Sequence, residues 1–361
     1  MNMYEFVFEE EVEEEELDEM REVRRYRRYF DREMTDFAFK EAFRLSVSQF
    51  EFLHGEIGVR LTSPTNRSHA LTAEEKILSS LHWMGTGSQY HSVSSMHGIS
   101  KSSVCRNVHE VISAIVSVLF QRLVCWPDDV GQIAAGFLQK GGFPSVAGCV
   151  DGTMVNIDAP TQFEEQYVNR HGKHAINVMA ICGPGLMLYA INASWPGSIH
   201  DSRVLWNTAI FRKFDVENWR PFPDAVILGD SAYPLKEWLI PPVIRNPENP
   251  EEQAFLRAHR QTRRLIENCF GIMKEKFPCL NHMRLEPEFA GMIVLACATL
   301  HNIALSIDRD DYGVEIVDLQ GGIEDDLDNL DDPEDLEDEP EARGARARGE
   351  RRLTRLINFF R

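Results

Sequence analysis

The sequence predicts an α/β protein with a mixed β-sheet, preceded by a helical region and flanked by acidic, disordered tails. Between residues 144 and 307, a hairpin signal precedes alternating strand-like and helical segments, which is typical of α/β folds. Between residues 70 and 124, apolar residues recur at helical spacing. At the ends of the chain, runs of acidic residues have too little apolar content to support a packed core.

Charge is distributed unevenly along the 361 residues, whose formal net charge is −19. Residues 1–59 hold 8 basic and 17 acidic side chains, and residues 311–361 hold 7 and 16. Residues 60–310 hold 23 and 24, so the centre of the chain is nearly neutral. The acidity therefore belongs to the ends, and it does not exclude a nucleic-acid substrate for the centre.

Cysteine usage and hydropathy indicate a soluble, intracellular protein. The seven cysteines form no CxxC pair, and most lie in apolar runs, which favours a reducing compartment over a disulfide framework. The longest apolar stretch, residues 292–305, is interrupted by polar residues and is too short to span a bilayer. It is predicted to be a buried helix, and the acidic N-terminus is unlike a signal peptide.

Residues 60–125 are expected to form a domain of the helix-turn-helix type. Thr72 and Glu75 form a capping-box signal, and a short helix over residues 93–97 stops at Gly98. A longer helix then begins with small polar and basic residues, as a recognition helix does. A plain three-helix bundle fits the same pattern. If the helix reads DNA, the candidate contacts are Lys101, Ser102, Ser103 and Arg106.

The remaining boundaries follow composition. Residues 1–59 are predicted to be an acidic and basic N-terminal arm with a linking region, and residues 126–143 a linker rich in Pro, Asp and Gly. Residues 308–361 are predicted to be a disordered tail, first acidic and then Arg-rich. Within the α/β region, strands are expected at 146–158, 175–182, 186–194 and 225–229, and helices at 201–214, 254–277 and 289–307.

Two of the predicted strands stop abruptly at an aspartate. Asp151 follows one buried run and Asp230 follows another. A carboxylate at the end of a buried strand needs a cation or hydrogen bonds from a facing element. Glu267 lies on a helical pattern, and the bases on its face are Arg260, Arg263 or Arg264, and Lys274. Such a set could hold Mg²⁺ beside a phosphodiester, although each acid alone also fits an ordinary exposed position.

Two further positions have alternative interpretations. Asp201 begins a predicted helix, where it could be an N-terminal cap or a fourth acidic metal ligand. His200 could contact phosphate or orient a carboxylate. A small basic cluster that includes Arg170 and Lys173 precedes a strand, and it could touch a DNA backbone or form only a polar loop.

Several ordered motifs together resemble the DDE domain of PIF/Harbinger transposases, and more closely the nucleases that animals have derived from them. The resemblance covers roughly residues 40–307. Its motifs are Val150-Asp151-Gly152-Thr153, Pro196-Gly-Ser-Ile-His-Asp201-Ser202, Gly229-Asp230-Ser-Ala-Tyr-Pro234, Arg264-Leu-Ile-Glu267-Asn-Cys-Phe-Gly271, Ala296-Cys-Ala-Thr-Leu-His-Asn-Ile303 and, in the helical segment, Gly85-Thr-Gly-Ser88 and Gly98-Ile-Ser-Lys-Ser102.

This resemblance implies an RNase H-like fold and two-metal phosphoryl transfer with Mg²⁺ or Mn²⁺. It implies that Asp151, Asp230 and Glu267 are the catalytic triad, with Asp201 as a further metal ligand. DNA is the implied substrate, Arg170, Lys173, Arg260 and Arg264 are candidate contacts, and a Myb/SANT-like protein is the implied partner, with residence in nucleus and cytoplasm. The alternative is a catalytically silent transposase derivative that acts as a DNA- or chromatin-binding adaptor.

Overall fold

The computed structural model describes residues 34–63, 70–244, 246–307 and 340–361. The chain divides into two compact units. Residues 1–119 and 276–280 make up a helical unit, and residues 120–275 and 281–361 make up a sheet unit. Most of the expected N-terminal arm, residues 1–33, and the acidic part of the expected tail, residues 308–339, lie outside the described residues.

The described part of the helical unit is built from helices around one apolar core. Leu53, Ile57, Leu81 and Ile112 are fully buried in that core. The helices are α2 (Asp36–Phe43), α3 (Val47–Leu61), α4 (Ala73–Thr86), α5 (Tyr90–His97) and α6 (Lys101–Ile115).

Local signals fix the ends of these helices. Thr72 caps α4 and forms the predicted capping box with Glu75. Gly87 and Gly98 end α4 and α5 in the left-handed conformation that glycine adopts without strain. Three residues, Gly98 to Ser100, then connect α5 to α6, and the Ser100 side chain caps α6.

Helices α2 and α3 occupy a region that the sequence predicts as arm and linker. Their aromatic rings explain why they fold, because Phe39 packs on Phe43 and Phe50 with ring centroids 4.8 and 5.6 Å apart. Burial of such rings contributes a large apolar area to the core. The described residues 34–59 are therefore part of the helical unit.

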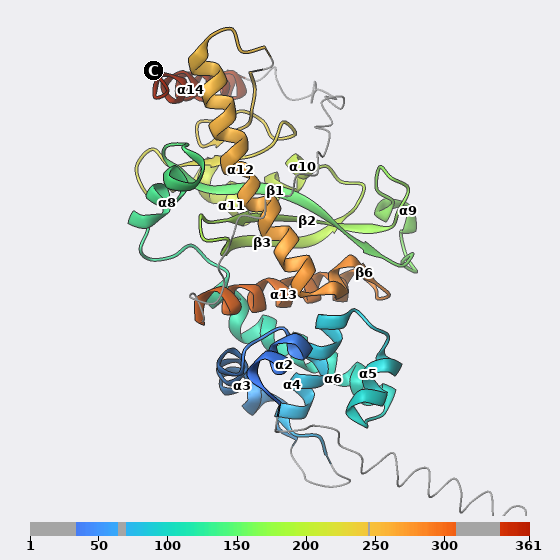
Figure 1. The fold of residues 1–361 in the computed structure, drawn as a ribbon. Helices are drawn as coiled ribbons and strands as arrows, with labels where there is room; N and C mark the ends of the chain where they lie inside the picture. Colours follow the sequence, from blue (N-terminus) through green and yellow to red (C-terminus); the bar gives the residue numbers. More distant parts are fainter. Residues whose placement is uncertain (1–33, 64–69, 245, 308–339) are drawn as a thin grey trace, which may run out of the picture. The chain divides into compact units, whose positions relative to one another are not determined.

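The sheet unit contains one mixed β-sheet, as the sequence predicts (Figure 1). The strand order is β3-β2-β1-β4-β5, and β6 pairs with the far end of β1. The β1–β2 and β2–β3 pairs are antiparallel, whereas β4 and β6 run parallel to β1, and β5 runs parallel to β4. The strands are β1 (Val146–Ile157), β2 (Ala175–Cys182), β3 (Leu188–Pro196), β4 (Val226–Leu228), β5 (Leu239–Ile240) and β6 (His282–Met283).

The helices of the sheet unit include two long ones, α12 and α13. Helix α12 crosses the sheet in front of β1, and α13 packs against β3 (Figure 1). The helices are α7 (Gln121–Leu123), α8 (Gly131–Gly141), α9 (Glu164–Tyr167), α10 (Asp201–Trp206), α11 (Ala209–Phe211), α12 (Pro250–Lys276), α13 (Pro287–Ile307) and α14 (Pro340–Asn358), and a short π-helix spans Arg212–Val216. Two further short segments lie at the boundaries between the units, a π-helix at Val116–Phe120 and a 3-10 helix at Pro278–Asn281.

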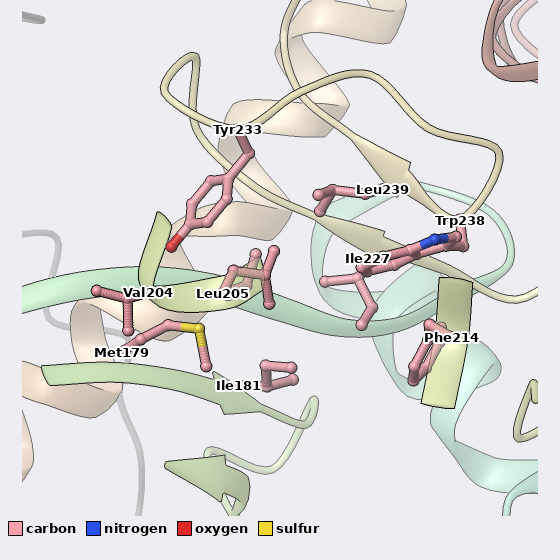
Figure 2. Close-up of a cluster of buried hydrophobic side chains, with 10 residues drawn as sticks. Met179, Ile181, Val204, Leu205, Phe214, Ile227, Tyr233, Trp238 and Leu239 are labelled. Carbon is pink, nitrogen blue, oxygen red and sulfur yellow. The ribbon is translucent and has the colours of Figure 1, made fainter. Parts of the chain in front are cut away.

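A cluster of buried side chains packs between the sheet and the segment that follows β3. Phe214 and Trp238 lie with their ring centroids 5.1 Å apart next to the fully buried Ile227 of β4, and Val204 of α10 is fully buried at the other end of the cluster (Figure 2). Tyr233 belongs to the same cluster. This packing fixes α10 and the loop after β4 to the sheet.

Helix α13 is the buried helix that the apolar stretch 292–305 predicts. It passes a length-and-composition test for a membrane span, as does Lys101–Leu123, but 78% of its apolar window is buried inside the structure. Its Asn302 donates a side-chain hydrogen bond to the Leu188 carbonyl and accepts one from the Leu188 amide, at 2.8 and 2.9 Å. These contacts satisfy the backbone amide and carbonyl of Leu188 on edge strand β3.

Two segments differ from the sequence-based expectation. Helix α8 lies within residues 126–143, which were expected to be a linker, because Ile133 and Phe137 are buried in the sheet unit. Helix α14 lies within the region expected to be a disordered tail, and its Leu356 is buried. In both cases a few apolar side chains supply packing that composition alone does not reveal.

Candidate active site

The parallel pairing of β1 with β4 brings Asp151 and Asp230 together. Cys149 of β1 is the register partner of Leu228 of β4. Each aspartate follows its partnered residue by two positions, so the two carboxyl groups lie at the same edge of the sheet. Strands that run parallel present their carboxyl ends together, and this is where ligands bind in α/β sheets.

The structure corrects one detail of this expectation. Asp151 does not end its strand, because β1 continues to Ile157 and Asp151 is paired with Ala180 of β2. Instead, the neighbouring strand β4 ends at Leu228, and the next strand on that side, β6, pairs with β1 only from Asn156. Asp151 therefore lies beside the gap between two partner strands.

Asp201 joins the two aspartates from the start of α10. Its carboxylate accepts a hydrogen bond of 2.6 Å from Asn177 Nδ2, which also donates to the Ile199 carbonyl at 2.7 Å. The cap position of α10 is His200, and its side chain makes no capping bond. A Cβ on Gly152 would come within 2.4 Å of the Asp201 carboxyl group, so only glycine leaves room for this approach.

Helix α12 is held across the sheet by polar contacts along its length. His259 Nε2 donates to the Ile240 carbonyl of β5 at 2.8 Å, and Lys274 Nζ donates to Thr153 Oγ1 of β1 at 2.7 Å. Glu267 lies on α12 between these two anchors. The anchors therefore fix where the Glu267 side chain leaves the helix.

Arg263 connects Glu267 to Asp151. Its Nη1 lies 2.9 Å from Asp151 Oδ2, and its Nη2 forms an ion pair with Glu267 Oε1. The Arg263 and Asp151 side chains are only 19% and 14% exposed. The sequence left open whether Arg263 or Arg264 shares the face of Glu267, and the structure selects Arg263. Charged contacts in such partly buried places are stronger than surface pairs.

The aspartates share a low-dielectric environment that disfavours their charged forms. The pKa of Asp151 is raised to about 7, chiefly by burial, with the charges of Asp230 and Asp201 acting in the same direction and Arg263 and the Gly152 amide opposing the rise. Burial also raises the pKa of Asp201 and, together with the Asp201 charge, that of Asp230. Carboxyl groups that destabilise one another's charge attract a cation.

Tyr233 is buried close enough to these carboxyl groups to feel their charge. Its hydroxyl group is buried and has no hydrogen-bond partner among the described residues, and burial with the charges of Asp201, Asp151 and Asp230 raises its pKa well above the usual range. Gly229 allows the ring to pack closely, because a Cβ there would meet the ring at 2.7 Å. The hydroxyl proton is a potential donor to the carboxylate cluster.

The other site residues predicted from the sequence fall into three groups. The charge of Arg170 lowers the pKa of both Asp201 and Asp230, so Arg170 borders the carboxylates. Arg260 and Arg264 lie on the exposed side of α12 near Glu267, and Lys173 lies on the exposed loop before β2. In the helical unit, Lys101, Ser102 and Arg106 are exposed and Ser103 is partly buried at the start of α6.

The donor chemistry suits a hard cation, although the side chains are not arranged around one. Asp151, Asp201 and Asp230 supply oxygen ligands of the kind that Mg²⁺ and Mn²⁺ prefer. Among the described residues, no three acidic, His or Cys side chains lie close enough to hold an ion as they stand. Asp151 and Glu267 are instead paired with the Arg263 guanidinium.

Sequence reasoning missed Asn177 and Tyr233. Asn177 lies in a run of otherwise apolar residues, Ala175 to Cys182, and one polar residue in a fully buried strand is a signal that could have marked it. Tyr233 stands in the motif that contains Asp230, but nothing in the sequence separates it from a core aromatic residue.

Comparisons with known proteins identify a family for this chain. The family model described as DDE superfamily endonuclease matches residues 150–302, which include all four carboxylates. The chain is 34% identical over 256 residues to "Putative nuclease HARBI1" of Homo sapiens, covering 69% of this chain and 72% of that protein. It is 34% identical over 268 residues to the protein of the same name from Xenopus laevis, covering 72% and 76%.

A more distant relative, "Protein ALP1-like" of Arabidopsis thaliana, is 21% identical over 289 residues, covering 75% of this chain and 71% of that protein. No solved structure matches this chain. The strands and helices that carry the carboxylates lie within the matched region. The chain therefore belongs to the Harbinger transposase-derived nuclease family, with a DDE superfamily endonuclease domain.

Proposed function

We propose that the protein cleaves or transfers DNA phosphodiester bonds with the help of a divalent metal ion, Mg²⁺ or Mn²⁺. Asp151, Asp230 and Glu267 are the proposed catalytic residues, and Asp201 is a further proposed ligand. The observation that supports this most directly is the register of β1 with β4, which sets Asp151 and Asp230 side by side. An adaptor that only binds DNA has no chemical need for such a set of buried carboxylates.

The side chains would have separate roles in binding the metal ion, orienting its ligands and contacting the phosphate. Asp151, Asp201, Asp230 and Glu267 would hold the cation, and Asn177 would keep the Asp201 carboxylate turned toward it. When bound, Mg²⁺ or Mn²⁺ supplies Lewis acidity, which polarises the phosphate and lowers the pKa of water. Arg263, released from its carboxylate partners, would offer a guanidinium fork to the phosphate oxygens.

Arginines outside the cluster would hold the DNA backbone. Arg170 borders Asp201 and Asp230, and exposed Arg260 and Arg264 lie on the helix that carries Glu267. Phosphate contacts of this kind position a duplex without reading its sequence. Lys173 is proposed to join them from the loop before β2.

The fold and the surroundings belong to the same proposal. The five-strand order with its antiparallel β1–β2–β3 meander and parallel β4 and β5 supports an RNase H-like fold. The short α5, the three-residue turn and α6 support a helix-turn-helix role, with Lys101, Ser102, Ser103 and Arg106 at the DNA. A Myb/SANT-like partner and residence in nucleus and cytoplasm are proposed from family resemblance alone.

The test compares wild type with Asp151→Asn in calorimetric titration with Mn²⁺ and in cleavage of labelled DNA. Both metal binding and cleavage should fall in the variant, cleavage by about a hundredfold or more, as expected when a main electrostatic stabiliser is removed. Asp158→Asn is the matched control, because Asp158 is an exposed carboxylate just past the end of β1. Cleavage that survives Asp151→Asn contradicts the assignment, and metal binding by neither protein favours the adaptor alternative.

A further inference from the structure

Helix α14 is anchored to the sheet unit through its apolar residues. Leu356 is buried, and the ring of Phe360, just past the helix, packs against Phe143 and Phe255 with centroid distances of 5.9 and 6.1 Å. Phe255 belongs to α12, the helix that carries Glu267. The Arg-rich end of the chain is therefore a fixed part of the sheet unit.

A buried arginine sets the rotation of α14 about its own axis. Arg352 is only 6% exposed, and its guanidinium lies 3.3 Å from the Asp224 carboxylate and also donates to the Asp224 carbonyl oxygen. Gly349, one turn earlier, packs closely on Leu235 and Lys236. With these residues facing inward, the flanks and the opposite side of the helix face solvent.

Three arginines form a stripe along one flank of α14, next to its buried face: Arg348, Arg351 and Arg355. They are all exposed and follow the i, i+3, i+7 spacing that places side chains on one helical face. Arg348 lies 3.8 Å from Glu237 and Arg355 lies 4.0 Å from Asp224, in exposed pairs that cost little to break. Residues 340–361 contain seven arginines against two glutamates, so the helix is strongly basic.

The same spacing occurs on α12. Arg257, Arg260 and Arg264 are exposed at i, i+3 and i+7, and Glu267 follows three residues after the last of them. The α12 stripe thus leads along the helix toward the proposed catalytic centre. Two helices of one unit, joined through Phe255 and Phe360, present the same arrangement of guanidinium groups.

We propose that the α14 stripe is a second anchor for duplex DNA, which binds the phosphate backbone in addition to the contacts beside the active site. This inference rests on the proposed function, because it names a further surface for the same substrate. Guanidinium groups bind phosphate in a bidentate way, and the stripe spans about 10 Å at 1.5 Å rise per residue, enough for more than one phosphate. In a chain of net charge −19, DNA affinity must come from local surfaces of this kind.

The experiment measures binding of a labelled duplex by fluorescence anisotropy, without divalent metal, over a series of salt concentrations. The test variant is the full chain with R348Q, R351Q and R355Q. Its log–log salt slope should fall by about two to three, and its affinity near 0.15 M salt should fall roughly tenfold, because about 0.9 counterions are released per phosphate contact. The lysine triple, R348K, R351K and R355K, should keep the wild-type slope.

A single-residue comparison on the same helix provides the matched control. Arg351→Gln removes the middle of the stripe, whereas Arg346→Gln removes an exposed arginine five residues away, on a different side of the helix, where it pairs with Glu350 at 3.4 Å. We expect Arg351→Gln to lower the salt slope by about one and Arg346→Gln to leave it unchanged. Equal thermal melting of the two variants shows that neither change unfolds α14.

The outcomes separate this inference from the proposed function. If wild type binds and cuts DNA while the glutamine triple keeps its slope and affinity, the anchor is refuted and the nuclease stands. If no version binds duplex at low salt, both fail together. The same titration with polyglutamate in place of DNA tests an acidic protein as the ligand. If the glutamine triple loses binding to polyglutamate but keeps its affinity for DNA, the stripe recognises an acidic protein, and the DNA anchor is refuted.

Discussion

Arg263 is the residue that balances the negative charge of two carboxylates in the site. Its guanidinium forms ion pairs with both Asp151 and Glu267. It thereby balances the negative charge of two carboxylates, which a bound cation would otherwise balance. Unpaired charges at such positions are costly, so Arg263 and a cation satisfy the same need. Arg263 is expected to oppose metal binding.

Replacement of Arg263 by glutamine tests this expectation. Loss of the competing positive charge should tighten Mn²⁺ binding on the order of tenfold, since about 1.4 kcal/mol corresponds to each power of ten, while cleavage should slow because a phosphate contact is lost. Calorimetry gives the first quantity and single-turnover cleavage the second. Arg264→Gln, one residue further along α12 and exposed, should leave the Mn²⁺ affinity unchanged. Weaker Mn²⁺ binding in Arg263→Gln would show that Arg263 orients the ligands and does not compete with the ion.

The residues of the site differ in how far the sequence revealed them. Asp151 and Asp230 stand out because each follows a short apolar run, and Gly152 beside the first indicates a close approach. Asn177 gave only the weak signal of one polar residue in an apolar run and Tyr233 gave none, because their roles depend on which strand or loop faces them. A hydrogen bond across 24 residues, such as Asn177 to Asp201, follows from the fold and not from local spacing.

At the scale of elements, helices α4 and α5 are joined by a pair of histidines. His82 Nδ1 and His97 Nε2 share a hydrogen bond of 3.0 Å. Burial, and then the charge of His82, lowers the pKa of His97 to about 4. Burial, and then the charge of Arg44, lowers the pKa of His82. The fold therefore holds His97 neutral, whereas the unfolded chain protonates it below about 6.5.

The sign of the pH effect follows from this difference. Between pH 6.5 and 4 the unfolded state binds more protons at His97, so stability is fully present above about 6.5 and is lost as the pH falls. His97→Gln should reduce the stability lost between pH 8 and pH 5 by roughly 2 kcal/mol. Urea unfolding of the full chain at both pH values measures this, with His91→Gln, at an exposed position of α5, as the control. An unchanged pH dependence in His97→Gln would contradict the prediction.

Sequence patterns predicted some of the helices and strands but not others. Strong periodicity and caps predicted α4, α6, α12 and α13, and the capping box at Thr72 was confirmed. The two-residue strands β5 and β6 carry too short a pattern to detect. The composition of α14 did not predict a helix, because the segment is rich in arginine. Its stability comes from Leu356 and Phe360, which pack against other elements.

At the scale of the whole molecule, each of the two units is built from two separate segments of the sequence. Residues 276–280 belong to the helical unit, although they separate α12 from β6 in the sheet unit. Phe277 and Leu280 are fully buried, and the backbone of Pro278 approaches within 3.0 Å of where a Cβ on Gly87 would lie. The helical unit is therefore completed by a segment that begins 161 residues beyond the end of α6, at Lys276 against Ile115.

Truncation of Leu280 tests this completion. Leu280→Ala should lower the free energy of unfolding of the helical unit by about 3 kcal/mol, the usual cost of a cavity left by a buried leucine. Urea unfolding followed by hydrogen exchange of α4 and α6 measures the loss in that unit. Asn281→Ala, at the exposed neighbouring position, should be nearly neutral. Full protection of α4 and α6 in Leu280→Ala would argue that the helical unit folds without this segment.

The sequence by itself determined the chemistry that is available: two aspartates after apolar runs, a glutamate on an amphipathic helix, and the family whose motifs these residues match. These properties are local, so spacing and composition reveal them. Only the tertiary structure decided which residues meet, because the β1–β4 register, the path of α12 and the docking of α14 depend on packing between segments far apart in the chain. Arg263 and Asn177 became part of the site through that packing.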